Sequence, residues 1–176
     1  MVEPCAGAYE AFCLREASRR TTMLDPNIRP SFIKDPDVYR ARINRMIEVA
    51  DIVKLSDEDL AWLTGSDDVD AGVASLLERG PSLICITRGS EGVSGYTVDG
   101  VVHVAANRVE VVDTVGAGDT FNAGFLAALH DAGALEKDAV RALDEGTIRN
   151  ALSLGAAAAA ITVSRAGANP PTRAEL

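Results

Sequence analysis

A β-branched run, a turn with two glycines and a helical pattern follow one another directly between residues 109 and 131. The run Val-Glu-Val-Val at 109–112 predicts a strand. Gly116 and Gly118 then predict a tight turn, and the helical pattern begins at Asp119. Unpaired N–H groups and the positive end of the helix dipole meet at such a turn. The sequence therefore predicts an anion-binding turn inside an α/β fold.

Helical and strand patterns alternate along the rest of the chain, which indicates a parallel sheet covered by helices. The expected helices are residues 8–19, 37–49, 68–79, 119–131, 137–143 and 147–163, with another helix beginning after Ser56, and the expected strands are residues 21–24, 52–55, 83–86, 95–98, 101–105 and 109–112. Asp99-Gly100 predicts a type I′ hairpin turn. No repeat or linker divides the chain, so we expect a single α/β domain over residues 1–176.

Composition excludes several classes of function. The formal net charge of −9 argues against a nucleic acid or an acidic membrane as the main partner. The start of the chain lacks a signal-peptide pattern, and the apolar stretch at 151–163 is too short to span a bilayer. Three cysteines without CxxC spacing predict buried or partly buried thiols in a reducing cytoplasm, and the two histidines lack metal-ligand spacing.

Polar clusters coincide with the predicted ends of several strands, where ligand sites form in open parallel sheets. These clusters are Asp25-Pro-Asn-Ile-Arg29, Lys54-Leu-Ser-Asp57, Thr87-Arg-Gly89 and Asp113-Thr114. Each also has a structural interpretation. Asn27 and Arg29 could be turn residues, Lys54 could extend to solvent, and the run from Thr87 to Gly92 could be a surface turn. Asp57 could belong to a solvated helix start or hold Mg²⁺ through water.

The presence of a carboxylate inside an anion-binding turn needs a chemical explanation, because a carboxylate repels phosphate. The direct one for Asp119 is proton removal from a hydroxyl that attacks a phosphoryl group. The alternatives are a first-turn acid favoured by the helix dipole and a tight turn without a ligand. The turn is not a Walker A loop, since no lysine follows its glycines. Nor is it a dinucleotide fingerprint, because Phe121 stands where the third glycine belongs.

Together these residues resemble the ribokinase (pfkB-type) family of carbohydrate kinases, most closely its fructokinase-like branch. Residues 113–121 match the family signature D-T-x-G-A-G-D-x-F throughout, and residues 87–92 are similar to its nucleotide loop, T-x-G-x-x-G. Gly167-Ala168 resembles the closing G-A of the family. The resemblance covers nearly the whole chain and implies a ribokinase-like, three-layer α/β/α fold with a mostly parallel sheet.

The resemblance also implies a role for each matching position. Asp119 would be the catalytic base, and the N–H groups of Gly116, Ala117, Gly118 and Asp119 would form the anion hole. ATP would be bound by Thr87, Gly89, Gly92 and Lys54, and the sugar by Asn27, Arg29 and Asp119. Asp57 would be linked to Mg²⁺, and Asp113 lies in a segment that often binds a monovalent cation such as K⁺.

The chain departs from the family in length. It has no G-G-x-x-x-N sugar-binding motif and no strands for a β lid, so it resembles the C-terminal portion only. We therefore expect either an ATP-dependent sugar kinase of which this is a part, or a non-catalytic nucleotide-binding module without a complete sugar site. A structural turn in an unrelated α/β protein is the third alternative. An open sheet edge left by missing N-terminal strands would favour a homodimer.

Overall fold

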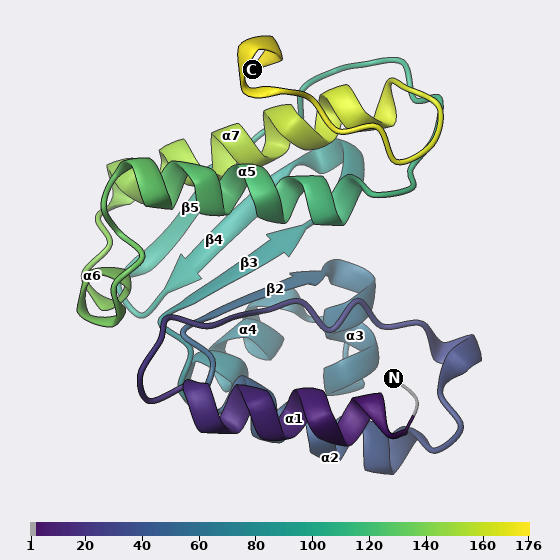
Figure 1. The fold of residues 1–176 in the computed structure, drawn as a ribbon, viewed down its shortest axis with the longest axis vertical. Helices are drawn as coiled ribbons and strands as arrows, with labels where there is room; N and C mark the ends of the chain where they lie inside the picture. Colours follow the sequence, from purple (N-terminus) through teal and green to yellow (C-terminus); the bar gives the residue numbers. More distant parts are fainter. Residues whose placement is uncertain (1–2) are drawn as a thin grey trace.

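The computed structural model describes residues 3–176 and has an α/β fold in which a sheet lies between two layers of helices (Figure 1). The strands lie side by side in chain order: β1 Met23–Leu24, β2 Ile52–Ser56, β3 Leu83–Thr87, β4 Val93–Thr97 and β5 Gly100–Val104. β1, β2 and β3 are parallel, whereas β4 and β5 run antiparallel to their neighbours. The expectation of a mostly parallel sheet is confirmed in part: β1, β2 and β3 are parallel, but the predicted hairpin of β4 and β5 pairs antiparallel, so the sheet is mixed.

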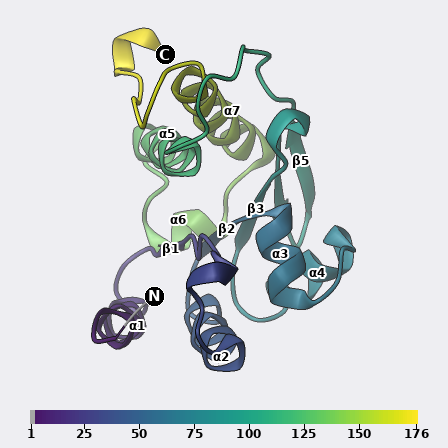
Figure 2. The ribbon, with the colours of Figure 1, turned by 90° about the vertical axis from the view of Figure 1, so that its right-hand side faces the viewer.

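Two groups of helices cover opposite faces of the sheet (Figures 1 and 2). The helices are α1 Cys5–Glu16, α2 Pro36–Ile47, α3 Asp57–Thr64, α4 Val69–Leu77, α5 Ala117–Asp131, α6 Lys137–Arg141 and α7 Glu145–Val163. α5 and α7 lie on one face, and α2, α3 and α4 on the other, with α1 packed against α2. Short 3₁₀ turns occur at Pro30–Phe32, Gly89–Glu91 and Arg173–Glu175. The three-layer expectation is confirmed.

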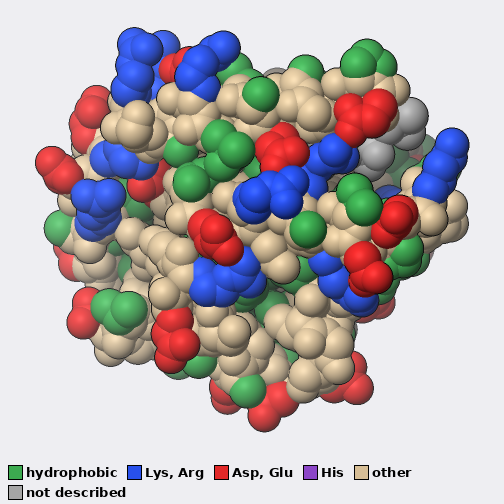
Figure 3. Space-filling model, turned by 90° about the horizontal axis from the view of Figure 1, so that it is seen from below, with side chains coloured by type: hydrophobic (Ala, Val, Ile, Leu, Met, Phe, Trp, Pro, Cys, Tyr) green, Lys and Arg blue, Asp and Glu red, His purple; other side chains and the backbone are tan. Residues whose placement is uncertain are grey.

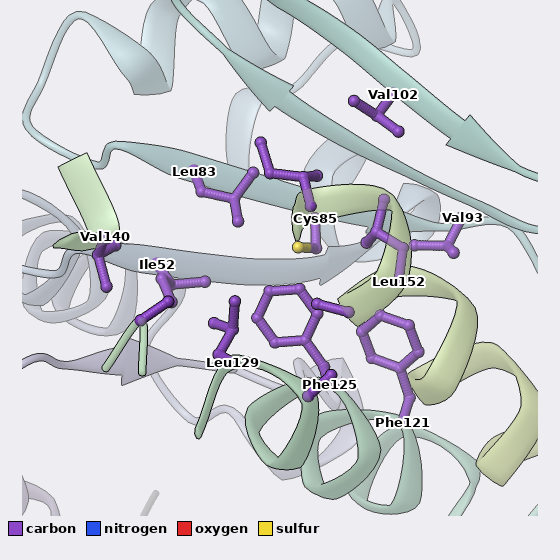
Figure 4. Close-up of a cluster of buried hydrophobic side chains, with 14 residues drawn as sticks. Ile52, Leu83, Cys85, Val93, Val102, Phe121, Phe125, Leu129, Val140 and Leu152 are labelled. Carbon is purple, nitrogen blue, oxygen red and sulfur yellow. The ribbon is translucent and has the colours of Figure 1, made fainter. Parts of the chain in front are cut away.

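The core consists of two clusters because the strands are buried on both faces. Ile52 and Cys85 face α5, whereas Val53 and Ile84 face the opposite helical layer. Figure 4 shows the aromatic side chains of α5 against the first of these surfaces. Such burial stabilises the fold by about 1.5–3 kcal/mol for each large apolar side chain. The sheet therefore holds α5 firmly.

α5 and α7 approach each other at two glycines. A Cβ atom on Gly124 would lie 2.9 Å from the carbonyl oxygen of Leu154, and one on Gly155 would lie 2.8 Å from the ring of Phe121. Larger residues at these positions would push the helices apart. The glycines thus let the two backbones touch and fix the first turn of α5 relative to α7.

The predicted strand at 109–112 is wrong. Residues 105–116 form no strand, and Val109, Val111 and Val112 are exposed. The sheet ends at β5, so the β-branched run has no strand to pair with, and tertiary structure overrides its propensity. Instead, the N–H groups of Val112 and Asp113 donate to the carbonyl oxygen of Val163, at 2.8 and 3.1 Å. This segment crosses the end of α7.

Other expectations hold with shifted boundaries. The expected helices and remaining strands are all present, and α5 begins at Ala117, two residues before Asp119. In α1, Tyr9 and Phe12 are exposed, although their helical spacing with Cys13 and Ala17 predicts an apolar packing face. Cys85 is buried and burial raises its thiol pKa to about 12, whereas Cys5 is exposed, contrary to the expectation of buried thiols.

Basic and acidic side chains intermingle on the face of the molecule formed by α1 and α2 (Figure 3). Glu10 of α1, for example, accepts hydrogen bonds from Arg42 at 3.2 Å and Arg45 at 2.6 Å, both on α2. This face therefore presents no large patch of one charge. Among the described residues, no helix has the length and apolarity needed to cross a membrane.

Candidate active site

Asp113 holds together the segment that leads into α5. Its Oδ1 accepts a hydrogen bond from the N–H of Val115 at 3.0 Å, and its Oδ2 accepts one from the N–H of Gly167 at 2.9 Å. Both bonds favour the ionised form and keep the carboxyl pKa below its usual value. Gly116 has φ +80°, and a Cβ there would lie 3.1 Å from Ala168. The C-terminal Gly167-Ala168 pair thus packs against the glycine turn.

Free N–H groups are present at the first turn of α5. The N–H of Ala117 donates to Thr114 at 3.3 Å, and that of Thr120 donates to Gly116 at 2.9 Å. Within residues 3–176, no oxygen accepts from the N–H of Gly118 or Asp119. Asp119 itself is exposed. The turn therefore offers unpaired donors at the positive end of a fifteen-residue helix, which is the arrangement that binds anions.

A second glycine loop follows β3. Gly92 has φ +100°, and a Cβ there would lie 2.1 Å from the carbonyl oxygen of Val104, so this position excludes every other residue. Gly89 has φ +49° and open space where a Cβ would lie. The N–H of Arg88 donates to the carbonyl oxygen of Gly92 at 2.8 Å and closes the loop. Gly92 therefore fixes the loop, while Gly89 leaves its surface accessible.

The two glycine loops border a cavity of about 650 Å³ between the sheet and α7. Its walls are mostly apolar. The lining residues are Thr87, Gly89, Ser90, Gly92, Val93, Ala106, Asn107, Arg108, Val109, Val111, Thr114, Ala117, Gly118, Phe121, Ala156, Ala159, Ala160 and Val163. A cavity of this size and character, with a few convergent polar groups, suits a drug-sized or nucleotide-sized ligand.

The third element is a buried polar cluster beneath the glycine turn. Lys54 is the central residue of β2, and its Nζ lies 3.1 Å from Oδ2 of Asp25. The same oxygen accepts a hydrogen bond from Nδ2 of Asn122 on α5 at 2.9 Å. A Cβ on Gly118 would lie 3.2 Å from Nζ of Lys54, so the ammonium is directly next to the anion-binding turn. Lys54 therefore does not extend into solvent.

The segment that was expected to contact sugar begins at Asp25. Asn27 has φ +44°, and its N–H donates to Oδ1 of Asp25 at 3.0 Å. The Asp25–Asn122 bond joins this segment to α5, three residues beyond Asp119 on the same helix. Arg29 is exposed and donates to the carbonyl oxygen of Ile28 at 2.9 Å. The structure thus brings the segment of Asn27 and Arg29 to the start of α5.

The two expected metal-linked acids differ in their surroundings. Asp57 is the first residue of α3, where its Oδ1 accepts from the N–H of Glu58 at 3.0 Å. Asp113 is engaged with Val115 and Gly167. No cluster of three His, Cys, Asp or Glu side chains arranged for a metal occurs within residues 3–176. The metal roles of both acids stay predictions.

Sequence reasoning placed Asp25 in a polar cluster at a strand end without giving it a role, and it missed Asn122 as a member of the site. It also missed the cavity wall formed by Ala156, Ala159 and Ala160 of α7. A signal for Asn122 was available, since it follows Asp119 by three positions and therefore shares its side of α5. Alanines of a buried helix, by contrast, look the same whether they line a core or a cavity.

Comparison with known proteins identifies the family. The model of the "pfkB family carbohydrate kinase" matches residues 3–175. The chain belongs to the pfkB family of carbohydrate kinases. A fructokinase of Rhizobium leguminosarum bv. trifolii is 54% identical over 147 residues, covering 84% of this chain and 45% of the relative. Probable fructokinase-4 of Arabidopsis thaliana is 34% identical over 180 residues, covering 100% of this chain and 53% of the relative.

Solved structures of pfkB-type kinases share the fold. A fructokinase double mutant from Vibrio cholerae O395, described with bound fructose, ADP and potassium ion, gives a TM-score of 0.82 at 26% identity and covers 94% of this chain and 52% of that one. A fructokinase with bound ATP from Xylella fastidiosa also gives 0.82, at 28% identity, with 93% and 52% coverage. The pfkB chain described here therefore spans about half the length of these relatives, and its ribokinase-like fold is that of their matching half.

Proposed function

We propose that this chain is the nucleotide-binding and phosphoryl-transfer portion of an ATP-dependent fructokinase-type kinase. The observation that carries the proposal is the cavity between two glycine loops, lined by Gly118, whose N–H group is unpaired within the described residues like that of the next residue, Asp119. Its apolar walls suit a purine, and the donors suit phosphate oxygens. The fructokinase relatives support fructose as the acceptor.

In the proposed reaction, Asp119 accepts the proton of a sugar hydroxyl. The freed oxygen attacks the γ-phosphorus of ATP, the bond from that phosphorus to the bridging oxygen breaks, and its electron pair leaves with ADP. The N–H groups of Gly116, Ala117, Gly118 and Asp119 are proposed to stabilise the charge on the transferring phosphoryl group, with Ala117 releasing its 3.3 Å bond to Thr114. The exposed carboxylate of Asp119 is free to meet an incoming alcohol.

The other assignments complete the site. Thr87, Gly89 and Gly92 are proposed to contact the nucleotide, with Lys54 near its phosphates. Asn27 and Arg29 are proposed to face the sugar. Mg²⁺ would neutralise phosphate charge, with Asp57 as its linked acid, and the segment at Asp113 is the candidate for a K⁺ site. Carboxylate and carbonyl oxygens are the ligands that these hard cations take.

The sugar site is proposed to be completed by residues outside this chain, since the relatives are about twice as long. Calorimetric titration with ATP–Mg²⁺ and with fructose tests this. We expect ATP binding by the chain, and sugar phosphorylation once the amino-terminal half of the Rhizobium fructokinase is joined to it. Absence of nucleotide binding at millimolar ATP would contradict the proposal.

A second candidate function is a nucleotide-binding module without kinase activity. The observation in its favour is that the chain covers only 45–53% of these fructokinases. It predicts ATP binding without fructose binding by the chain, and no phosphorylation after the two halves are joined. The joined protein therefore separates the two candidates.

A further inference from the structure

The buried cluster beneath the glycine turn contains a carboxylate that the proposed reaction does not use. Asp25 is 15% exposed at its side chain and Lys54 only 8%. A buried lysine is retained at a large free-energy cost unless its charge is paired. Removing both charges of the pair from water costs free energy even when they are paired. Because the pair lies at the end of the sheet where ligands bind, this cost indicates a function beyond folding.

Two hydrogen-bond donors and one ammonium group converge on the Asp25 carboxylate. Oδ1 accepts from the N–H of Asn27 at 3.0 Å, and Oδ2 accepts from Asn122 at 2.9 Å while lying 3.1 Å from the ammonium of Lys54. The carboxylate is therefore held from the β1 side by its own loop and from the other side by α5. It has little freedom to follow the lysine if the lysine moves.

Asn122 is oriented by this carboxylate. Its amide must turn the NH₂ group toward Asp25, because a carboxylate only accepts hydrogen bonds. As a result its Oδ1 is buried without a partner among the described residues. Burying an acceptor without a hydrogen-bond partner costs free energy. The bond from Asn122 to Asp25 is therefore formed although it leaves Oδ1 of Asn122 unpaired within residues 3–176.

The ammonium of Lys54 is only partly engaged. It carries three N–H groups, and the carboxylate of Asp25 is its one charged partner within residues 3–176. The position of a Cβ on Gly118 lies 3.2 Å away, so nothing but hydrogen separates the ammonium from the first turn of α5. A lysine side chain without such a partner usually extends its amine to solvent.

We propose that Asp25 is a positioning residue which, anchored by Asn122, holds the ammonium of Lys54 beneath the glycine turn for phosphate binding. The proposal rests on the nucleotide site proposed above and adds to it the group that keeps the lysine in place. Lys54 then adds a fixed positive charge to the N–H donors of the turn, and the charge needs no rearrangement when the nucleotide binds.

A double-mutant cycle on the full chain tests this, with ADP–Mg²⁺ and adenosine as the two probes in calorimetric titrations. The variants are Lys54→Met, Asp25→Asn and the double variant. We expect each single variant to bind ADP about tenfold more weakly, as for the loss of one charged hydrogen bond, and the double variant to bind no worse than Lys54→Met. Adenosine affinity should stay unchanged, because it lacks phosphates.

Each other outcome overturns the inference. Unchanged or tighter ADP binding in Asp25→Asn would show that the carboxylate only screens the lysine. Equal weakening of ADP and adenosine would indicate a merely structural role. Asn122→Leu, which keeps both charges, serves as the second test if Asp25→Asn does not fold, and it should weaken ADP in the same selective way. If the unmodified chain binds adenosine but not ADP, the inference fails. If it binds neither, the proposed function fails first.

Discussion

Two buried aspartate–lysine pairs lie at opposite ends of the sheet. At the amino end, Asp51 accepts two bonds of 2.7 Å from Lys137 and one of 2.9 Å from the N–H of Thr22. At the carboxyl end, Lys54 lies 3.1 Å from Asp25 and directly next to the glycine turn. The first pair is closed, since Asp51 is 5% exposed and Lys137 also reaches a backbone carbonyl. In the second pair, the ammonium lies next to Gly118, which lines the cavity.

We interpret the Asp51–Lys137 pair as a contribution to stability and the Asp25–Lys54 pair as part of the functional site. At the amino end, Lys137 joins α6 to the start of β2, and neither member of the pair lines the cavity of about 650 Å³. At the carboxyl end, the cavity, the unpaired N–H groups and Asp119 gather within the first turn of α5. Similar side-chain chemistry therefore has a different meaning at each end, and the following variants test that distinction.

Asp119→Asn should have the largest effect. Removal of a general base costs about 10²–10⁴-fold in turnover, whereas an uncharged side chain at the same place leaves the nucleotide contacts intact. The measurement is fructose phosphorylation by the protein joined to the Rhizobium amino-terminal half, with ATP affinity determined in parallel. Turnover equal to that of the unmodified protein would show that Asp119 is not the catalytic base.

Lys137→Met should chiefly change stability. Breaking a buried pair leaves the Asp51 charge uncompensated and should lower the free energy of unfolding by about 3 kcal/mol. Urea denaturation measures this, and ADP affinity should stay the same. Arg141→Met is the matched control: its partner Asp138 is three residues away on an exposed face of the same helix, α6, and its loss should barely change the free energy of unfolding. A loss of ADP binding in Lys137→Met would break the distinction between the two ends.

The nucleotide loop offers a matched pair of glycines. Gly92→Ala adds a Cβ 2.1 Å from a carbonyl oxygen at φ +100°, so it should destabilise the fold by about 2–3 kcal/mol. Gly89→Ala meets open space and should cost about 1 kcal/mol from its backbone conformation alone. Thermal unfolding ranks the two. Because Gly89 leaves the surface of the loop accessible, Gly89→Ala should nevertheless weaken ADP binding. Equal stability of the two variants would contradict the role of Gly92 in fixing the loop.

The smallest expected effect concerns pH. Hydrogen bonds from Val115 and Gly167 lower the folded-state pKa of Asp113, so its contribution to stability is complete above its unfolded pKa of about 3.9. That contribution is lost as the pH falls through the lower, folded value. Asp113→Asn should therefore flatten part of the decline in melting temperature between about pH 4 and pH 2. A variant with the same acid profile as the unmodified chain would exclude this role.

Local signals in the sequence predicted much of this molecule. The glycine turn of residues 116–118 was identified because few residues fit such a backbone conformation. The hairpin was also identified, but with its turn one residue too late: Thr97 pairs with Gly100, so the turn residues are Val98 and Asp99. The error at residues 109–112 came from the absence of a neighbouring strand, which no local pattern reveals. The bond between Asp25 and Asn122 was missed for a related reason: the two residues are 97 positions apart, and only the folded chain brings them together.

The most direct test of the whole account is a map of amide chemical shifts as ADP–Mg²⁺ is added to the isotope-labelled chain. We predict that the perturbed amides are those of Gly116, Gly118 and Asp119, together with the loop from Thr87 to Gly92, while the amides of Thr22 and Asp51 at the other end of the sheet do not move. Perturbations centred on Asp51, or none at either glycine loop at saturating ADP, would contradict it.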